Sequence, residues 1–132
     1  MPTAALPLSF PSELGISAFR TGDEVARTPA LAATAIRWFG ANGYAVLGTE
    51  LWLIKDGAIQ SLPVGLSGMR EVHGNTVNRG NQEPWSGFVA RAAAETGAYL
   101  QSFDPADIVE FGDVYFNVVW TGESEYETLT PS

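Results

Sequence analysis

The stretch YAVLGTELWLIKDGAIQSL, residues 44–62, decides the fold because it reads as two strands joined by a tight turn. Residues 44–54 are rich in the β-branched, aromatic and large apolar side chains that suit strands. The turn signal is Lys55-Asp56-Gly57, since Asp-Gly is favoured where a hairpin needs positive φ angles, and the return strand begins at 59–62. Both faces of the first strand are apolar, apart from Glu50, so we predict that it lies in the centre of its sheet.

A helix is predicted just before this hairpin, in TPALAATAIRWFGANG, residues 28–43. Thr28 is placed as the N-cap, and Pro29 suits the first helical position, where a missing N–H costs nothing. Asn42 and Gly43 supply the C-terminal stop, where a left-handed backbone is needed. The side chains expected to face the core, at helical spacing, are Leu31, Ala35, Trp38 and Phe39.

The segment that follows the hairpin, residues 63–83, is polar and rich in glycine. Loops of this length within a compact domain are often functional or mobile. The segment also has room for a short strand near Val72 or Val77. We therefore expect a long loop that holds at most a short piece of sheet.

The strongest helix signal is EPWSGFVARAAAETGAYLQSF, residues 83–103, with Pro84 at the first helical position and Asp104-Pro105 as the end. Gly87 and Gly97 weaken this helix by about 1 kcal/mol each relative to Ala. We expect them to allow close packing on the sheet. The apolar stripe consists of Trp85, Phe88, Val89, Ala92, Thr96, Tyr99, Leu100 and Phe103.

A last strand is predicted in GDVYFNVVWTG, residues 112–122, with one apolar and one mixed face. The order of elements gives an α+β fold: a mainly antiparallel sheet packed against two main helices in a single domain. We expect an irregular N-terminal segment at 1–28, the domain at 29–122, and an acidic, frayed tail at 123–132. The apolar face is formed by Val114, Phe116, Val118 and Trp120, and the mixed face by Asp113, Tyr115, Asn117 and Val119.

Charge is distributed unevenly along the 132 residues, whose formal net charge is −8. All seven basic residues lie in residues 1–91, where seven acidic residues balance them, and the other eight acidic residues lie in 92–132. Such asymmetry bears on partners and association rates rather than on fold. It argues against nucleic acids and anionic membranes as partners, which need basic patches, and it permits a basic protein partner.

Catalytic and metal-binding signals are weak. The chain has no cysteine, which excludes a disulfide scaffold, a thiol nucleophile and a cysteine zinc site. Its one histidine, His73, lies in the predicted loop without a nucleophile motif, and the calcium-loop and phosphate-loop patterns are absent. We predict a protein that is not an enzyme, with no cofactor and no metal. The prolines near the N-terminus break any signal-like apolar run, and no run of about 18 apolar residues exists, so we expect a cytoplasmic protein.

Four tryptophans and Glu50 leave several interpretations open. Trp38 and Trp120 are expected in the core, whereas Trp85 opens its helix beside the long loop and is expected to be half exposed. Glu50 is either an edge residue that faces solvent or a buried acid that needs a partner such as Arg37 or Arg91.

The segments AIRWFGANGYAVLGTELWLIKDGAIQ, EPWSGFVARAAAETGAYLQSF and VYFNVVW together resemble immunity protein family 40 of bacterial polymorphic toxin systems. The resemblance covers roughly residues 32–120. It is carried, in order, by Gly43, Tyr44, Leu47, Gly48, Trp85 and Tyr99. We expect these positions to be structural, with Gly43 as a helix stop, Gly48 at a bulge or close approach, and Trp85 and Tyr99 as packing anchors.

The resemblance implies a protein that binds a cognate toxin, possibly a nuclease with a basic cleft, and blocks it without being an enzyme. An acidic surface would steer such an association. The expected toxin-facing residues are Asp104, Asp107, Glu110 and Asp113, helped by the loop acids Glu71 and Glu83.

Two alternatives stay open at this point. One is a small ligand-binding or hydrolytic α+β domain with a pocket between helix and sheet, holding Glu50, His73 or Asp113. The other is an adaptor that binds a partner without inhibiting any activity. Whether the chain is a monomer or a small homo-oligomer is left undecided.

Overall fold

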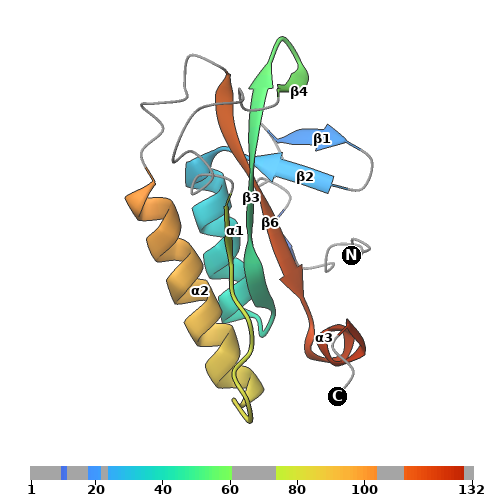
Figure 1. The fold of residues 1–132 in the computed structure, drawn as a ribbon, viewed down its shortest axis with the longest axis vertical. Coiled ribbons are helices and arrows are strands. Elements are labelled where there is room, and N and C mark those ends of the chain that lie inside the picture. The colour runs from blue at the N-terminus through green and yellow to red at the C-terminus, as the bar shows by residue number, and fades with distance from the viewer. Residues whose placement is uncertain (1–9, 12–17, 22–23, 61–73, 104–111, 130–132) are drawn as a thin grey trace.

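The structure is a computed structural model that describes residues 10–11, 18–21, 24–60, 74–103 and 112–129. Within these ranges the chain forms an antiparallel sheet and three helices, which confirms the predicted single α+β domain (Figure 1). The elements in chain order are β1 (Phe19–Thr21), β2 (Glu24–Arg27), α1 (Pro29–Ala41), β3 (Ala45–Lys55), β4 (Ala58–Gln60), β5 (Gly74–Thr76), α2 (Trp85–Ser102), β6 (Asp113–Thr121) and α3 (Glu123–Leu129).

The sheet has the order β1-β2-β6-β3-β4, and β5 pairs with β3 beside β4. Every described pairing is antiparallel. The long strand β3 is bonded to β6 along one edge and to β4 and β5 along the other, so its predicted central position is confirmed. Apolar residues on both faces are typical of a strand inside a sheet, and the neighbours Leu53 and Ile54, which point to opposite faces of β3, are both buried.

The predicted hairpin is formed by β3 and β4. Lys55 pairs with Ala58, and the two residues between them, Asp56 and Gly57, have φ angles of 54° and 76°. Two positive φ angles in a two-residue loop match the right-handed twist of the flanking strands. The turn signal in the sequence is therefore confirmed.

The ends of α1 follow the sequence closely. Pro29 is its first residue and Thr28 is the N-cap, although the Thr28 side chain makes no capping hydrogen bond. At the other end Gly43 has a φ of +84°, and the N–H of Tyr44 donates to the carbonyl of Phe39 at 3.0 Å. The rings of Phe39 and Tyr44 also pack against each other. This is the glycine-terminated helix end with its apolar contact that the Asn-Gly pair predicts.

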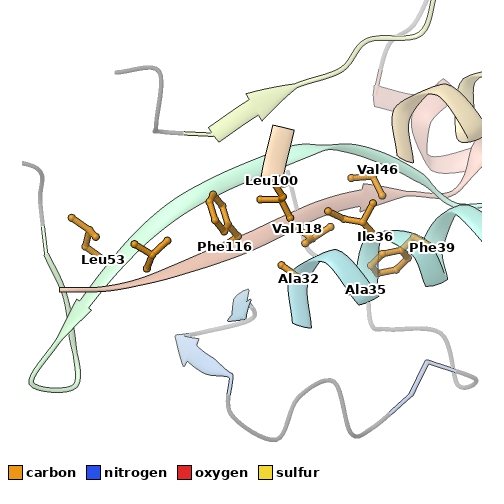
Figure 2. Close-up of a cluster of buried hydrophobic side chains, with 10 residues drawn as sticks. Ala32, Ala35, Ile36, Phe39, Val46, Leu53, Leu100, Phe116 and Val118 are labelled. Carbon is orange, nitrogen blue, oxygen red and sulfur yellow. The ribbon is translucent and has the colours of Figure 1, made fainter. Parts of the chain in front are cut away.

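The main core lies between one face of the sheet and the two long helices (Figure 1). Figure 2 shows the buried side chains of α1 and of β3 and β6 filling this layer, with Leu100 reaching it from α2. Phe39 and Phe116 are fully buried here, and Trp38 and Trp120 pack against the cluster as predicted. The buried members are Ala32, Ala35, Ile36, Phe39, Val46, Leu53, Leu100, Val114, Phe116 and Val118.

A second apolar cluster lies at the first half of α2, where Phe88, Val89 and Ala92 meet Ala45 and Val77. Tyr126 of α3 packs on this cluster, with ring centroids 5.9 Å from Trp85 and 5.5 Å from Phe88. The C-terminal segment is therefore a docked helix from Glu123 to Leu129, and the expectation of a frayed tail is wrong for these residues.

The N-terminal segment is also more regular than expected. Residues 19–21 and 24–27 form β1 and β2, and β2 pairs with β6 through Ala26 and Asn117. Strands of three and four residues carry little periodicity of their own. They form because β2 pairs with the edge of β6, a strand distant in sequence, and β1 pairs with β2. The prediction of an irregular segment at 1–28 is therefore wrong in these two ranges.

Strand β5 occupies Gly74–Thr76, just before Val77, which confirms a short strand in this part of the segment. The Thr49 hydroxyl donates to Asn75 Oδ1 at 2.7 Å, and Asn75 Nδ2 donates to the Thr96 hydroxyl oxygen at 3.2 Å. Thr49 and Thr96 are buried, so this chain of hydrogen bonds satisfies polar groups that link β3, β5 and α2.

The glycines of the helices act differently from the prediction. A Cβ at Gly87 or Gly97 would meet no atom within 4 Å, so neither provides close packing. The close approach is at Gly40 of α1, where a Cβ would lie 2.8 Å from that of Ala93. Pro84 is the N-cap of α2 rather than its first helical residue. Among the described helices, none is both long and apolar enough to cross a membrane.

Candidate interaction surface

The six carboxylates predicted to bind a toxin fall into two groups. Four of them lie outside the described residues: Glu71, Asp104, Asp107 and Glu110. His73, a candidate of the alternative interpretation, lies outside them as well. The structure places the remaining two, Glu83 and Asp113.

Glu83 is engaged within the chain. Arg91 Nε donates to Glu83 Oε2 at 2.9 Å, and a second guanidinium nitrogen of Arg91 donates to Oε1 at 2.8 Å. The backbone N–H of Gly80 donates to Oε1 at 2.7 Å. The hydrogen bonds from Arg91, followed by that from Gly80, lower the pKa of Glu83 from 4.5 to about 2. Glu83 thus binds the segment before α2 to the helix itself.

Asp113 opens β6 and is exposed. Figure 1 shows that the start of β6 and the start of α2 lie at opposite ends of the molecule. The structure therefore does not bring Glu83 and Asp113 together. Of the two described candidates, Asp113 is the one that faces solvent on the sheet.

The face of the sheet that points away from α1 and α2 follows from the register of β3 and β6. Phe116, Val118 and Leu53 point into the core, so their neighbours along each strand point to the other side. Directly opposed residues of an antiparallel pair share a face. We call this side the outer face; its paired rows are Glu50 with Asn117, Trp52 with Tyr115, and Ile54 with Asp113.

Two further strands extend the outer face. Ala26 of β2 pairs with Asn117, and Phe19 of β1 pairs with Ala26. The rings of Phe19 and Trp52 pack at right angles, with centroids 6.1 Å apart. Phe19, Trp52 and Tyr115 are all half-buried. The outer face thus carries three aromatic side chains that are partly accessible.

The charges of the outer face are negative at the described positions of β3 and β6. Glu50 and Asp113 are exposed, and none of the described positions on these two strands holds Lys or Arg on this face. Glu50 does not bind Arg37 or Arg91; its Oε1 accepts a hydrogen bond from Asn117 Nδ2 at 2.9 Å. Glu50 faces solvent, as one of the two interpretations expected, but it does so from a central strand rather than from an edge, because β5 and β6 pair with β3 on either side of it.

Sequence reasoning assigned Asp113 to the binding surface and left the burial of Glu50 open. It placed Tyr115 on the mixed face of its strand, but it gave no binding role to Tyr115, Trp52 or Phe19. A signal was present for Tyr115, because its strand alternates and the face of Asp113 is mixed. For Trp52 the sequence shows no alternation of apolar and polar residues, because its neighbours Leu51 and Leu53 are also apolar. Phe19 was missed because its strand was not predicted.

The positions that carry the family resemblance make contacts inside the fold. Trp85 Nε1 donates to the Gly43 carbonyl at 3.0 Å, which joins the start of α2 to the end of α1. The ring of Tyr44 stacks on Trp38. Gly48 lies at a register shift between β3 and β6 and at a close approach of β5. Tyr99 packs on Phe116 with ring centroids 6.3 Å apart.

Metal-binding geometry is not found among the described residues, where no group of three or more His, Asp or Glu side chains is placed to hold an ion. The outer face carries aromatic rings on strands, with one carboxylate in each flanking row. Comparison of the chain with protein-family models, with curated proteins and with solved structures found no match.

Proposed function

We propose that this chain is an immunity protein that binds a cognate toxin with a basic surface and neutralises it through the outer face. The observation that carries the proposal is the combination on one rigid sheet face of the exposed carboxylates Glu50 and Asp113 with the half-buried rings of Trp52, Tyr115 and Phe19. The resemblance of residues 32–120 to immunity proteins supports the same conclusion.

The physical basis has two parts. Carboxylates on a surface of a chain with net charge −8 attract a basic partner and raise the rate of encounter. Partly desolvated aromatic side chains then supply most of the binding free energy, because tryptophan and tyrosine are enriched among the residues that dominate interfaces. Glu50, Trp52, Tyr115 and Asp113 lie on the central strands β3 and β6, so little order is lost on binding.

The alternative of a ligand pocket between helix and sheet receives no comparable support. In the described part of the chain, that layer is occupied by apolar side chains in mutual contact (Figure 2). The register of β3 and β6 puts Glu50 and Asp113 on the opposite face of the sheet.

The test is growth rescue. The chain is co-expressed with the product of the neighbouring gene, at an induction level at which that product alone stops growth. We expect the chain to restore growth. We also expect the double variant Glu50→Gln and Asp113→Asn to restore it less well, because two charges are removed while both side-chain shapes are kept.

The matched control is the double variant Glu123→Gln and Glu127→Gln, which removes the same charge from α3. α3 lies at the opposite end of β6 from Asp113, roughly 25 Å away along the strand. Equal loss of rescue in both variants would indicate a general effect of net charge and would contradict the assignment of the outer face. A neighbouring product that is harmless alone, or whose toxicity persists, would contradict the immunity function itself.

A further inference from the structure

We infer that the outer face binds an arginine side chain of its protein partner, stacked on Trp52 and Tyr115 between Glu50 and Asp113. This inference rests on the proposed function, which supplies a basic partner, and it adds the chemistry of the contact. The three paired rows of the outer face place the aromatic pair in the middle and one carboxylate in each flanking row. Residues two apart on a strand lie about 7 Å apart, so both carboxylates are within reach of a cation above the rings.

The side chains of this face are held in place before any partner arrives. The perpendicular packing against Phe19 fixes the orientation of the Trp52 indole. The hydrogen bond from Asn117 to Oε1 fixes the carboxylate of Glu50, and Asn117 itself is buried. A preorganised acceptor beside a fixed ring loses little entropy when it binds a cation.

The same chain shows this arrangement with an arginine in it. The guanidinium of Arg91 lies over the ring of Phe88, 5.6 Å from its centroid, and pairs with Glu83 and Glu95, each at 2.8 Å. Arg79 lies over Trp85 in a similar way, at 5.4 Å. An aromatic ring flanked by two carboxylates thus holds a guanidinium elsewhere in this fold. On the outer face, β3 and β6 supply the rings of Trp52 and Tyr115 and the carboxylates of Glu50 and Asp113. We assign the arginine that completes this arrangement to the partner.

Arginine is favoured over lysine for a physical reason. A guanidinium is planar, stacks on an aromatic face and donates to a carboxylate from its edge at the same time. A lysine ammonium is a strongly hydrated point charge that gains less from the ring. The face should therefore discriminate between two side chains of equal charge.

The test uses three peptides of the form acetyl-Gly-Xaa-Gly-Xaa-Gly-amide, in which Xaa is arginine, lysine or the neutral arginine analogue citrulline. Each is titrated into the ¹⁵N-labelled full chain and followed by NMR. We expect the arginine peptide to shift the Trp52 indole N–H and the backbone amides of Glu50, Asp113 and Tyr115. We also expect it to bind at least about threefold more tightly than the lysine peptide, and the citrulline peptide to bind most weakly.

The variant Trp52→Leu should remove the preference for arginine over lysine, and Asp113→Asn should weaken both peptides alike. Equal binding of the arginine and lysine peptides, shifts centred on α3 instead of the outer face, or no shift at millimolar peptide would each overturn the inference. In those cases, growth rescue that depends on Glu50 and Asp113 would still support the immunity function, although the arginine contact would be rejected. Conversely, arginine binding at Trp52 without any growth rescue would keep the inference and remove the immunity function.

Discussion

At the scale of single residues, Gly48 is the position at which backbone geometry is most demanding. Its φ is +144°, and a Cβ there would overlap the carbonyl oxygen of Asn75 in β5. We predict that Gly48→Ala lowers the free energy of unfolding by at least about 2 kcal/mol, because strained backbone and a clash with another strand act together. Urea unfolding at constant m-value measures the change. An unchanged midpoint would show that β5 can move away from β3 at little cost.

Gly40 and Gly97 form a natural pair for comparison, since both are helical glycines. Replacing Gly97 by Ala should raise the free energy of unfolding by about 1 kcal/mol, because helix propensity improves and nothing lies within 4 Å of the new methyl group. Replacing Gly40 by Ala should lower it by about 1–3 kcal/mol, because α1 and α2 must separate around Ala93. Thermal unfolding of the two variants checks the opposite signs. The same sign in both would mean that propensity outweighs packing at the helix contact.

Glu83 gives the chain a defined dependence of stability on pH. Its folded-state pKa of about 2 lies below its ordinary value of 4.5, so the unfolded state takes up a proton first as pH falls. The stabilisation by this carboxylate is fully present above about pH 4.5 and is lost as pH falls towards 2. We predict that Glu83→Gln reduces the drop in unfolding free energy between these two pH values.

Urea unfolding at a series of pH values from 6 to 2 measures this slope. The control is Glu127→Gln, which changes the net charge equally but lies on exposed α3. If the two variants showed the same pH profile as the unchanged chain, the ion pair of Glu83 with Arg91 would not contribute to the acid sensitivity of the fold.

At the scale of secondary-structure elements, α3 illustrates how a short helix is held by one side chain. Tyr126 packs on Trp85 and Phe88, and its hydroxyl oxygen accepts a hydrogen bond from the backbone N–H of Arg79 at 3.3 Å. A helix of seven residues is too short to be stable alone in water. The position of α3 therefore depends on this contact with the second apolar cluster.

We predict that Tyr126→Ala detaches α3 and lowers the free energy of unfolding by about 2 kcal/mol, since the ring is half-buried. Hydrogen exchange should become fast for the α3 amides while those of β3 and β6 stay protected. Tyr126→Phe is the matched control, because it keeps the ring and removes only the hydroxyl, at a cost of about 1 kcal/mol. Protected α3 amides in the alanine variant would show that other contacts hold the helix.

The central hairpin differs from α3, because local sequence signals alone predict its turn and its strands. Asp56-Gly57 gives the turn, and the apolar residues on both sides of the turn give the strands. The register with β6, however, contains a shift between Val46 and Gly48 that is imposed by the fold around it. The local signal therefore predicts the element, and the neighbouring strands adjust its geometry.

At the scale of the whole molecule, the two described apolar clusters lie on the helix side of the sheet or at its α3 end. The outer face carries exposed carboxylates and half-buried aromatic rings beside the buried residues Ala26, Ile54 and Asn117. The acids of residues 92–132 that the structure describes do not form one patch in space. Asp113 lies at one end of β6 and the acids of α3 lie at the other, while Glu95 pairs with Arg91. Charge that is contiguous in sequence is thus separated by the length of a strand.

The elements with strong periodicity or clear end signals were predictable: α1, α2, the β3–β4 hairpin and β6. The strands β1 and β2 and the helix α3 were not, because each is too short to show a pattern and is stabilised by partners far along the chain. For the candidate surface, Asp113 was identified from charge on a strand, whereas the sequence left open whether Glu50 is buried. Trp52 was not identified, because a tryptophan among apolar residues has the same appearance whether it points into a core or out of it.

The sequence by itself determined the fold class, the central hairpin, both long helices and the acidity of the chain, because these depend on local propensity, periodicity and composition. Only the tertiary structure decided which residues share the outer face. Strand register pairs Glu50 with Asn117, Trp52 with Tyr115, and Ile54 with Asp113. The physical reason is that side chains alternate between faces with a period of two, so a single-residue change in register would exchange this surface for the core.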